Sequence, residues 1–318
     1  MLEKITTHQS EEDIRNRSIF IYIDGKLVRR EKATVNVYDS GFMLGDGIWE
    51  GLRLLDGSWI FLDEHLDRLL EAAIAIDLDI VMDKKGLIEA LEITRQKNKM
   101  FTDAHARLMI TRGVKIKPFQ HPSLSRSGPT MVIIMEHSKA LSQRAIRLAT
   151  VPHIRGLPMT QDPKLNSHSK LNCVLACIAA EKAGADEALM LDVNGFVNTT
   201  NACNFFIVRN DEVWTSTGDY CMNGITRRKV IEICRLNGIP TYEKNFSLVE
   251  TYGADEAFIT GTFGAQTQVS EIDGRVIGNG KLGPITKRIQ GLYKELIRNE
   301  KVSCFWRCGL AHETYLPL

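Results

Sequence analysis

The chain has 318 residues, with 40 lysines and arginines against 39 aspartates and glutamates, so its formal net charge is only +1. This length is enough for two domains that each bury a core. The balanced charge, without a long run of one sign, argues against nucleic acid and membrane surfaces as partners. The sequence contains no run of about 18 apolar residues, so no membrane span is predicted. The segment Met1–Arg17 is charged throughout and does not resemble a secretory signal.

In the first 137 residues, hairpins and helices follow one another. A hairpin is expected at Ile19–Val28 around Asp24-Gly25, and the glycines of residues 41–47 predict a flexible loop. Asp63 is a favourable N-cap for a helix that runs to about Ile76. The other expected elements are the strand Ile48–Leu55, the helix Lys84–Lys97, and the strands Ala104–Thr111 and Met131–Glu136.

The polar segment Ser138–Arg144 is the predicted linker between a domain of residues 1–137 and a domain of residues 145–318. Helices and strands mix without strict β-α-β alternation, which favours an α+β fold. The elements expected after the linker are a strand from Ile146, a strand pair at Phe205–Val208 and Glu212–Thr215, a helix from Gly224 to about Leu236, a strand at Glu256–Thr260, a hairpin at Asp273-Gly274 and a helix from Gly283 to about Asn299.

The segment Asp162–Asn204 holds the residues best suited to chemistry. A loop with Lys164 and Lys170 precedes an apolar helix, and a hairpin turned by Asn194-Gly195 follows it. This order can bring a lysine amine and a polar strand end to one place. Such an arrangement suits Schiff-base chemistry.

The seven cysteines are scattered and form no disulfide framework. They are Cys173, Cys177, Cys203, Cys221, Cys234, Cys304 and Cys308. An odd number without regular spacing favours reduced thiols and a cytoplasmic location. Cys304 and Cys308 are not followed by a second pair of ligands, so no metal site is expected.

Two glycine-containing sequences could bind an anion. Gly224-Ile225-Thr226 begins a predicted helix, where free backbone N–H groups and the helix dipole favour negative charge. Gly261-Thr262-Phe263-Gly264 follows a predicted strand. Taken alone, each sequence is a weak signal, because a Gly-Ile-Thr helix start is usually only a cap. Arg68, on the helix expected to begin at Asp63, could likewise be an ordinary solvated charge.

Together these motifs resemble the class IV (fold-type IV) pyridoxal-phosphate aminotransferases. This family includes the branched-chain, D-amino-acid and (R)-amine aminotransferases and the related aminodeoxychorismate lyase. The resemblance extends from Ile19 to about Ile297. It rests on the motifs Gly45–Gly51, Glu64–Leu69, Arg107–Gly113, Ala183–Ala188, Asn223–Arg227, Gly261-Thr262 and Glu271–Arg275.

The resemblance implies a small N-terminal α/β domain, a larger C-terminal pseudo-barrel domain, pyridoxal 5'-phosphate between them, and a homodimer. By position it implies that the cofactor is bound by Arg68, Thr199, Gly224, Ile225, Thr226, Gly261 and Thr262. It also implies that Trp49 lines the substrate site and that Arg107 and Arg112 bind a carboxylate. Alternatively, Trp49 could be an ordinary core residue, and Arg107 and Arg112 could be solvated charges.

One departure from the family concerns the Schiff-base lysine. When the family pattern is laid without gaps on residues 155–184, Asn166 occupies that position. Lys164 lies two residues before Asn166, and side chains two residues apart in a strand point to the same face. Lys170 lies four residues after Asn166, close to one helical turn, so its side chain could also reach that face. Lys170 is the preferred candidate, Lys164 is the alternative, and a site without any Schiff base is a third reading.

The second departure is Thr199, which stands where the family has a glutamate that pairs with the pyridine nitrogen of the cofactor. A neutral threonine loses the charge-assisted hydrogen bond, so we expect the cofactor to be a weaker electron sink.

The predicted function is a pyridoxal-phosphate-dependent aminotransferase that moves an amino group between an amino acid or primary amine and a 2-oxo acid. The donor is left open among branched-chain L-amino acids, D-amino acids and (R)-amines. The alternatives are a lyase of the aminodeoxychorismate type and a cofactor-binding homologue with weakened chemistry.

Overall fold

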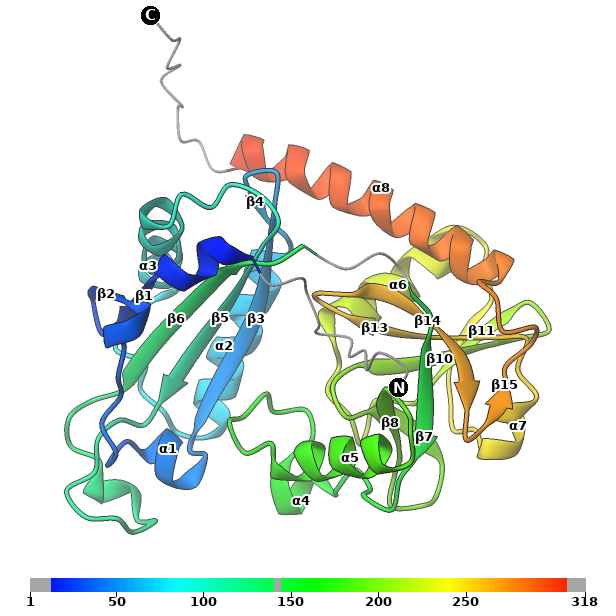
Figure 1. The fold of residues 1–318 in the computed structure, drawn as a ribbon, viewed down its shortest axis with the longest axis horizontal. Helices are drawn as coiled ribbons and strands as arrows, with labels where there is room; N and C mark the ends of the chain where they lie inside the picture. Colours follow the sequence, from blue (N-terminus) through cyan, green and yellow to red (C-terminus); the bar gives the residue numbers. More distant parts are fainter. Residues whose placement is uncertain (1–12, 140–143, 308–318) are drawn as a thin grey trace, which may run out of the picture.

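The structure is a computed structural model that describes residues 13–139 and 144–307, with the backbone alone from residue 301 onward. Residues 140–143, inside the expected linker, and Cys308 lie outside the described residues. Strands before residue 138 form one sheet and strands after residue 144 form another (Figure 1). Within the described residues, no helix combines the length and apolar composition needed to cross a bilayer.

The first sheet has six strands in the order β2-β1-β6-β5-β3-β4. They are β1 (Phe20–Ile23), β2 (Lys26–Arg29), β3 (Gly47–Leu55), β4 (Ser58–Trp59), β5 (Ala104–Thr111) and β6 (Thr130–His137). Helices α2 (Leu62–Ala75) and α3 (Lys84–Lys97) pack on one face and bury a core with it. Short helical turns lie at η1 (Ile14–Ser18), η2 (Arg30–Lys32) and η3 (Pro122–Leu124).

The alternation of side chains along β3 and β5 decides which residues face the second half of the molecule. Ile48 and Leu108 point into the core beneath α2 and α3. Trp49 and Arg107 belong to the alternate set, so their side chains project from the opposite face of the sheet. The sequence period of two thus places an aromatic ring and a guanidinium on the same open face.

The second sheet has nine strands and closes on itself. Its path is β12-β11-β10-β13-β14-β7-β8-β9, and β9 also pairs with β10, which closes a ring of six strands. The strands are β7 (Ile146–Thr150), β8 (Glu187–Leu191), β9 (Val197–Thr200), β10 (Asn204–Arg209), β11 (Glu212–Thr215), β12 (Thr241–Glu243), β13 (Glu256–Gly261), β14 (Ala265–Ile272) and β15 (Arg275–Val276). The mixed pairing and the closed sheet confirm the two-part α+β fold.

The helices of the second half lie around this barrel. They are α4 (Pro158–Gln161), α5 (Leu171–Lys182), α6 (Ile225–Leu236), α7 (Leu248–Tyr252) and α8 (Pro284–Arg307). Helix α8 crosses both halves at the top of the view (Figure 1). Its Tyr293 packs edge-on against Phe61, which follows β4, with 6.2 Å between ring centroids. The two halves therefore share a hydrophobic core.

Two expectations for the first half are wrong. The glycine-rich residues 41–47 are not simply a loop, because α1 (Ser40–Leu44) forms there; Asp39 accepts a hydrogen bond from the Gly41 amide, and Gly45 ends the helix with φ 69°. Asp63 is not the N-cap, because α2 begins one residue earlier, after Phe61 with φ 54°. Asp63 instead lies in the first turn, where a carboxylate also stabilises the helix dipole.

Candidate active site

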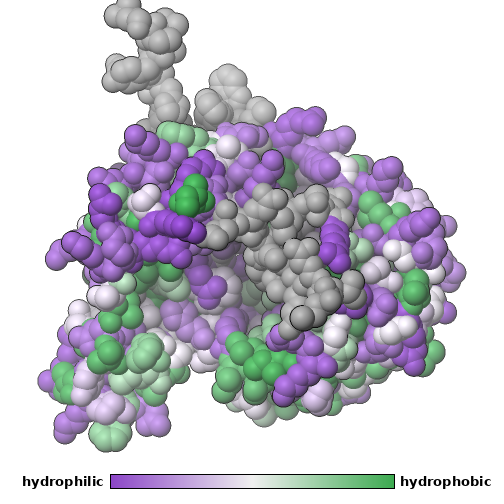
Figure 2. Space-filling view, viewed as in Figure 1, coloured by the Kyte–Doolittle hydropathy of each residue, from purple (hydrophilic) through white to green (hydrophobic). Residues whose placement is uncertain are grey.

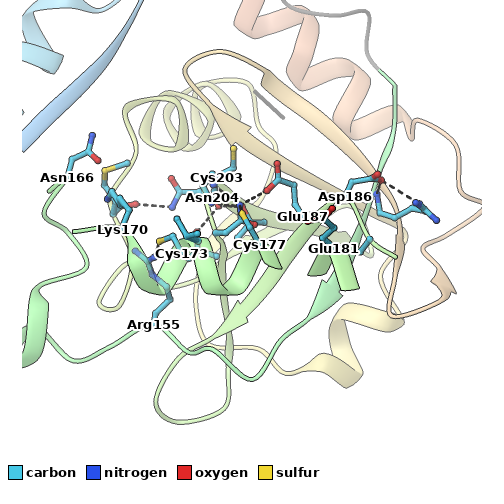
Figure 3. Close-up of a pocket in the computed structure, with 18 of the residues that line it drawn as sticks. Arg155, Asn166, Lys170, Cys173, Cys177, Glu181, Asp186, Glu187, Cys203 and Asn204 are labelled. Atoms are coloured by element: carbon cyan, nitrogen blue, oxygen red, sulfur yellow. Dashed lines mark hydrogen bonds and ion pairs between the residues drawn. The ribbon is translucent and has the colours of Figure 1, made fainter. Parts of the chain in front are cut away.

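A cavity of about 890 Å³ lies between the two sheets. Trp49 and Arg107 line it from the first sheet, and Lys170 lines it from the start of α5. In Figure 3, Lys170, Cys173 and Arg155 lie together at one end, whereas Glu181, Asp186 and Glu187 lie at the other. The cavity is therefore cationic at one end and acidic at the other.

The loop before α5 is bound to the edge of β3. The Trp49 amide donates to the Asn166 carbonyl at 3.0 Å, and the His168 amide donates to the Gly47 carbonyl at 2.9 Å. The Asn166 side-chain amide donates to the Trp49 carbonyl at 2.7 Å, and the Trp49 indole donates to the Ser167 carbonyl at 3.1 Å. These bonds fix the loop against the first sheet, so Asn166 has a structural role.

We expect Asn166→Ala to lower the free energy of unfolding by about 1–3 kcal/mol, because the buried Asn166 side chain would no longer donate its hydrogen bond to the Trp49 carbonyl. Urea unfolding followed by circular dichroism measures this. The control is Asn172→Ala, which removes an amide that donates to the Ile154 carbonyl at 2.9 Å from an exposed position. Equal losses of stability in both variants would contradict the role assigned to Asn166.

Lys170 presents an amine to the cavity. Its Nζ lies 5.8 Å from the centroid of the Trp49 ring, and it has no hydrogen bond or ion pair with any described residue. The pKa of Lys170 is lowered from its ordinary 10.5 to about 8, mainly because the amine is buried; the positive charges of Arg155, Arg107 and Arg68 contribute to this shift, and Cys173 opposes it. A much larger fraction of this amine than of an ordinary lysine is therefore unprotonated near neutral pH and can act as a nucleophile.

The lowered pKa predicts a pH profile. The neutral amine reacts with aldehydes, so capture of pyridoxal phosphate should rise with pH and be half-complete near pH 8 rather than 10.5. The fraction captured is measured by borohydride reduction at each pH. Arg155→Gln removes a nearby positive charge and should move the midpoint upward, whereas a midpoint at the ordinary lysine value would contradict the burial of the amine.

The same shift has a consequence for folding. Between about pH 8 and 10.5 the unfolded chain binds more protons at Lys170 than the folded chain does. The contribution of this group to stability therefore becomes more favourable as the pH rises through that window.

Arg68 lies close to the start of α6. Its Nε and Nη2 each donate to Glu50 at 2.7 Å, and its Nη1 lies 3.5 Å from the Asn223 carbonyl. Burial alone would raise the pKa of Glu50, but hydrogen bonds from His65 and Arg68 hold it below its ordinary value. Glu50 therefore stays ionised and fixes the guanidinium beside Gly224, Ile225 and Thr226.

The start of α6 is built to accept an anion. Its N-cap, Gly224, has no side chain to satisfy the free amides, and Ile225 and Thr226 are buried. A Cβ on Gly224 would clash with Asn204 Oδ1, so a larger residue here would have to displace the Asn204 side chain. Thr260, which pairs with Asn204 and precedes Gly261 and Thr262, has a buried hydroxyl without a hydrogen-bond partner among the residues that the structure describes. These features fit the phosphate group of pyridoxal phosphate.

Thr199 is 4% exposed and its hydroxyl donates to the Cys203 carbonyl at 2.7 Å. The Thr200 hydroxyl donates to the same carbonyl at 2.9 Å. Because the only proton of the Thr199 hydroxyl is already used, its oxygen can accept a hydrogen bond but cannot donate one. Thr199 could therefore offer no negative charge to a protonated pyridine nitrogen of the cofactor. It could also offer no hydrogen-bond donor to that nitrogen in its unprotonated form.

Arg107 and Arg112 have different environments. The Arg107 guanidinium stacks 3.8 Å from the Trp49 ring centroid in the cavity, and burial lowers its pKa. Arg112 donates to both Asp46 carboxylate oxygens, at 2.8 and 3.1 Å, and to the carbonyls of Ile76 and Asp77. The structure therefore brings Arg107 to the site and leaves Arg112 in a structural ion pair outside the cavity lining.

The structure places the two candidate lysines in different environments. Lys164 is exposed and does not line the cavity, whereas Lys170 does.

Sequence reasoning missed Arg155 and Cys173, which also line the cavity. Cys173 follows Lys170 by three residues, so helical spacing could have indicated it. Sequence spacing could not identify Arg155, because its position depends on a long-range hydrogen bond that its backbone amide donates to the Leu191 carbonyl.

Thiols line much of the cavity without forming a metal site. Cys173, Cys177 and Cys203 all contribute to the lining. Burial, together with Glu187, raises the pKa of Cys177 to about 11, so this thiol stays protonated. In the described part of the chain, no group of three or more histidine, cysteine or acidic residues is arranged to hold a metal ion.

The sequence and the fold are those of a known protein family. The family model described as amino-transferase class IV matches residues 47–272. Branched-chain-amino-acid aminotransferase-like protein 2 of Arabidopsis thaliana is 40% identical over 283 residues, which cover 88% of this chain and 51% of that protein. A putative branched-chain-amino-acid aminotransferase of Methanocaldococcus jannaschii is 39% identical, with 87% of this chain and 96% of that protein covered.

Among solved structures, the branched-chain aminotransferase of the thermophilic archaeon Thermoproteus uzoniensis with norvaline superposes with a TM-score of 0.81 at 31% identity, covering 90% of this chain and 97% of that one. The chain belongs to the class IV aminotransferase family. It spans about half the length of the Arabidopsis relatives that it matches.

Proposed function

We propose that this protein is a pyridoxal-phosphate-dependent transaminase that moves an amino group from an amino acid or primary amine to a 2-oxo acid. The donor is a branched-chain L-amino acid, a D-amino acid or an (R)-amine. The observation that carries the proposal is the amine of Lys170, which lines the cavity between the two sheets and has no ion-pair partner in the described part of the chain. Membership of the family supports the reaction class.

Each residue would have a defined role. Arg68 and the amides of Ile225 and Thr226 would hold the phosphate, and Gly261 and Thr262 would complete that cradle. When bound, the cofactor supplies a conjugated ring that accepts the electrons released when the substrate loses its α-proton. Lys170 would hold the cofactor through the cofactor's aldehyde carbon until the substrate's amine displaces it, and its released amine would then move the proton at the substrate's α-carbon.

Borohydride reduction in the presence of pyridoxal phosphate, followed by peptide mass mapping, tests this assignment. We expect the label on Lys170. A label on Lys164 would transfer the role to that residue. No label at saturating cofactor would contradict the proposed chemistry and favour a homologue that binds the cofactor without reacting.

A lyase of the aminodeoxychorismate type is the second candidate, and the environment of Thr199 is what favours it. A weaker electron sink at the ring nitrogen can change how the substrate's bonds break, because less charge is stabilised on the ring. Release of pyruvate without an acceptor would identify a lyase. Amino exchange that requires a 2-oxo acid would identify a transaminase.

We also propose a homodimer that works in the cytoplasm. Helix α5 carries four exposed apolar side chains at helical spacing: Leu171, Val174, Leu175 and Ile178. Figure 2 shows hydrophobic surface near the lower edge of the molecule, in the region where Figure 1 places α5. A second copy would bury this stripe next to the cavity. Light scattering at several concentrations measures the oligomeric state.

A further inference from the structure

The turn between β13 and β14, residues 262–264, is held from the other half of the molecule. Arg53, on β3 of the first sheet, donates through Nη1 to the Phe263 carbonyl at 3.1 Å. The buried Phe263 ring meets the His105 ring edge-on, with 6.1 Å between ring centroids. His105 lies on β5 directly opposite Arg53. Two neighbouring strands of the first sheet therefore fix this turn of the barrel.

The backbone of the turn needs such an anchor. Ala265, which ends the turn, has φ 50°, a left-handed conformation that is unfavourable for a residue with a Cβ. Gly261 pairs with Ala265 across the base of the turn. A strained conformation persists only where surrounding contacts hold it. Release of Phe263 would therefore let the turn relax and would move Thr262, which the proposed function assigns to the phosphate cradle.

Arg53 also brings a positive charge to this place. Its side chain is half-buried, and burial lowers its pKa, although Tyr293 and Asp103 oppose that shift. Its hydrogen bond is to a neutral carbonyl, and it forms no ion pair with a described residue. A partly buried cation is stabilised when an anion comes near it. A phosphate held by Thr262 would be such an anion.

The hydroxyl of Tyr293 joins this arrangement from helix α8. Burial raises the pKa of Tyr293 to about 12, and the Thr226 side chain and the Arg53 guanidinium oppose the rise, which places both groups close to the hydroxyl. Thr226 lies in the first turn of α6, the other part of the proposed cradle. Arg53 and Tyr293 are thus neighbours that contact both parts of the cradle from outside it.

We propose that Arg53 is a positioning residue for the cofactor's phosphate: it fixes the turn that carries Thr262 and adds positive charge near the phosphate. Tyr293 supports Thr226 in the same way, with a smaller effect. Recognition of the phosphate then requires the first sheet as well as the barrel, and a bound phosphate in turn strengthens the contact between the two halves. The identity of the phosphate as that of pyridoxal phosphate rests on the proposed function.

Two ligands that differ only in the phosphate, pyridoxal 5'-phosphate and pyridoxal, provide the test. Equilibrium dialysis measures both dissociation constants for the full chain. Arg53→Gln should weaken binding of pyridoxal phosphate by about tenfold or more, because a charged hydrogen bond is lost, and leave that of pyridoxal within about twofold. Arg53→Lys keeps the charge and should retain part of the affinity. Tyr293→Phe, which keeps the ring against Phe61, should weaken only pyridoxal phosphate, by about threefold.

Arg209→Gln is the matched control. Arg209 likewise donates through Nη1 to a backbone carbonyl, that of Glu250, at 3.2 Å, but outside the cradle. This variant should keep both dissociation constants within about twofold of the parent's. Inorganic phosphate gives a readout that does not depend on the ring. It should raise the melting temperature of the parent and of Arg209→Gln, and raise that of Arg53→Gln less at the same concentration.

The outcomes separate this inference from the proposed function. Equal affinities of the parent for the two ligands, a preference for pyridoxal phosphate that survives Arg53→Gln, or an equal loss of both ligands would overturn the role of Arg53, even if borohydride labels Lys170. A lost preference and a weaker response to inorganic phosphate in Arg53→Gln would support it, even if no lysine is labelled and the transaminase is rejected. If Arg53→Gln does not fold, Arg53→Lys decides: a loss confined to pyridoxal phosphate supports the role, and any other result contradicts it.

Discussion

Replacement of Lys170 by alanine is expected to lower the rate of amino transfer by about a thousandfold, within the range for loss of a general base. The variant would also lose covalent capture of the cofactor. The physical reason is that Lys170 places in the cavity an amine whose pKa is lowered to about 8, so that more of it is unprotonated near neutral pH. Single-turnover kinetics with an amino donor measure the rate, and borohydride reduction measures the capture.

Lys164→Ala is the matched control, because it removes an amine from the same loop at an exposed position. This variant should keep both the rate and the capture. Lys170→Arg adds a second control, since it preserves positive charge near Arg107 and Arg155 but cannot form the covalent bond. If Lys170→Ala keeps the parent's rate of amino transfer and Lys164→Ala loses it, Lys164 and not Lys170 would be the catalytic lysine.

Thr199→Glu is expected to accelerate the first half-reaction by about tenfold or more, because a carboxylate would give a protonated ring nitrogen the charge-assisted bond that threonine cannot give. Stopped-flow spectroscopy of the cofactor-loaded protein measures this half-reaction. Thr199→Gln, which is similar in size but neutral, should show little gain. A half-reaction rate in Thr199→Glu no different from the parent's would refute our account of this position.

The same substitution should also change stability in a cofactor-dependent way. Position 199 is 4% exposed, so a glutamate there without cofactor would be a buried charge without a partner. We therefore expect a lower melting temperature than the parent's in the cofactor-free protein, and recovery when cofactor binds. A melting temperature that does not respond to cofactor would indicate that the new carboxylate does not meet the ring nitrogen.

Periodicity in the sequence was sufficient to predict most elements of the fold. The helix Lys84–Lys97 and the strand Ala104–Thr111 have the predicted bounds, because their apolar residues repeat with one clear period. Helix α1 was missed because its glycines favour a loop, and the Asp39 cap that stabilises it depends on a single side chain. Local signals of this kind are weak until the tertiary structure is known.

The site was less predictable because its residues meet through long-range contacts. The pairing of Gly47 with Thr111 sets Asp46 and Arg112 opposite each other, so the register of two strands commits Arg112 to an ion pair. No sequence pattern reveals that register. Family position suggested Arg68, Arg107 and Thr226 as candidates, whereas Arg155 became a candidate only from the structure. The catalytic and binding roles of all these residues stay predictions until they are tested.

The attachment of the loop at residues 166–168 to the edge of β3 has a consequence for protein engineering. Residues 13–137 on their own would expose the backbone groups of Gly47 and Trp49 that this loop now covers. An uncovered strand edge is a template for intermolecular pairing, so a fragment that ends before the loop should aggregate. Co-expression with the remaining residues, which would restore the missing edge, should keep that fragment in solution.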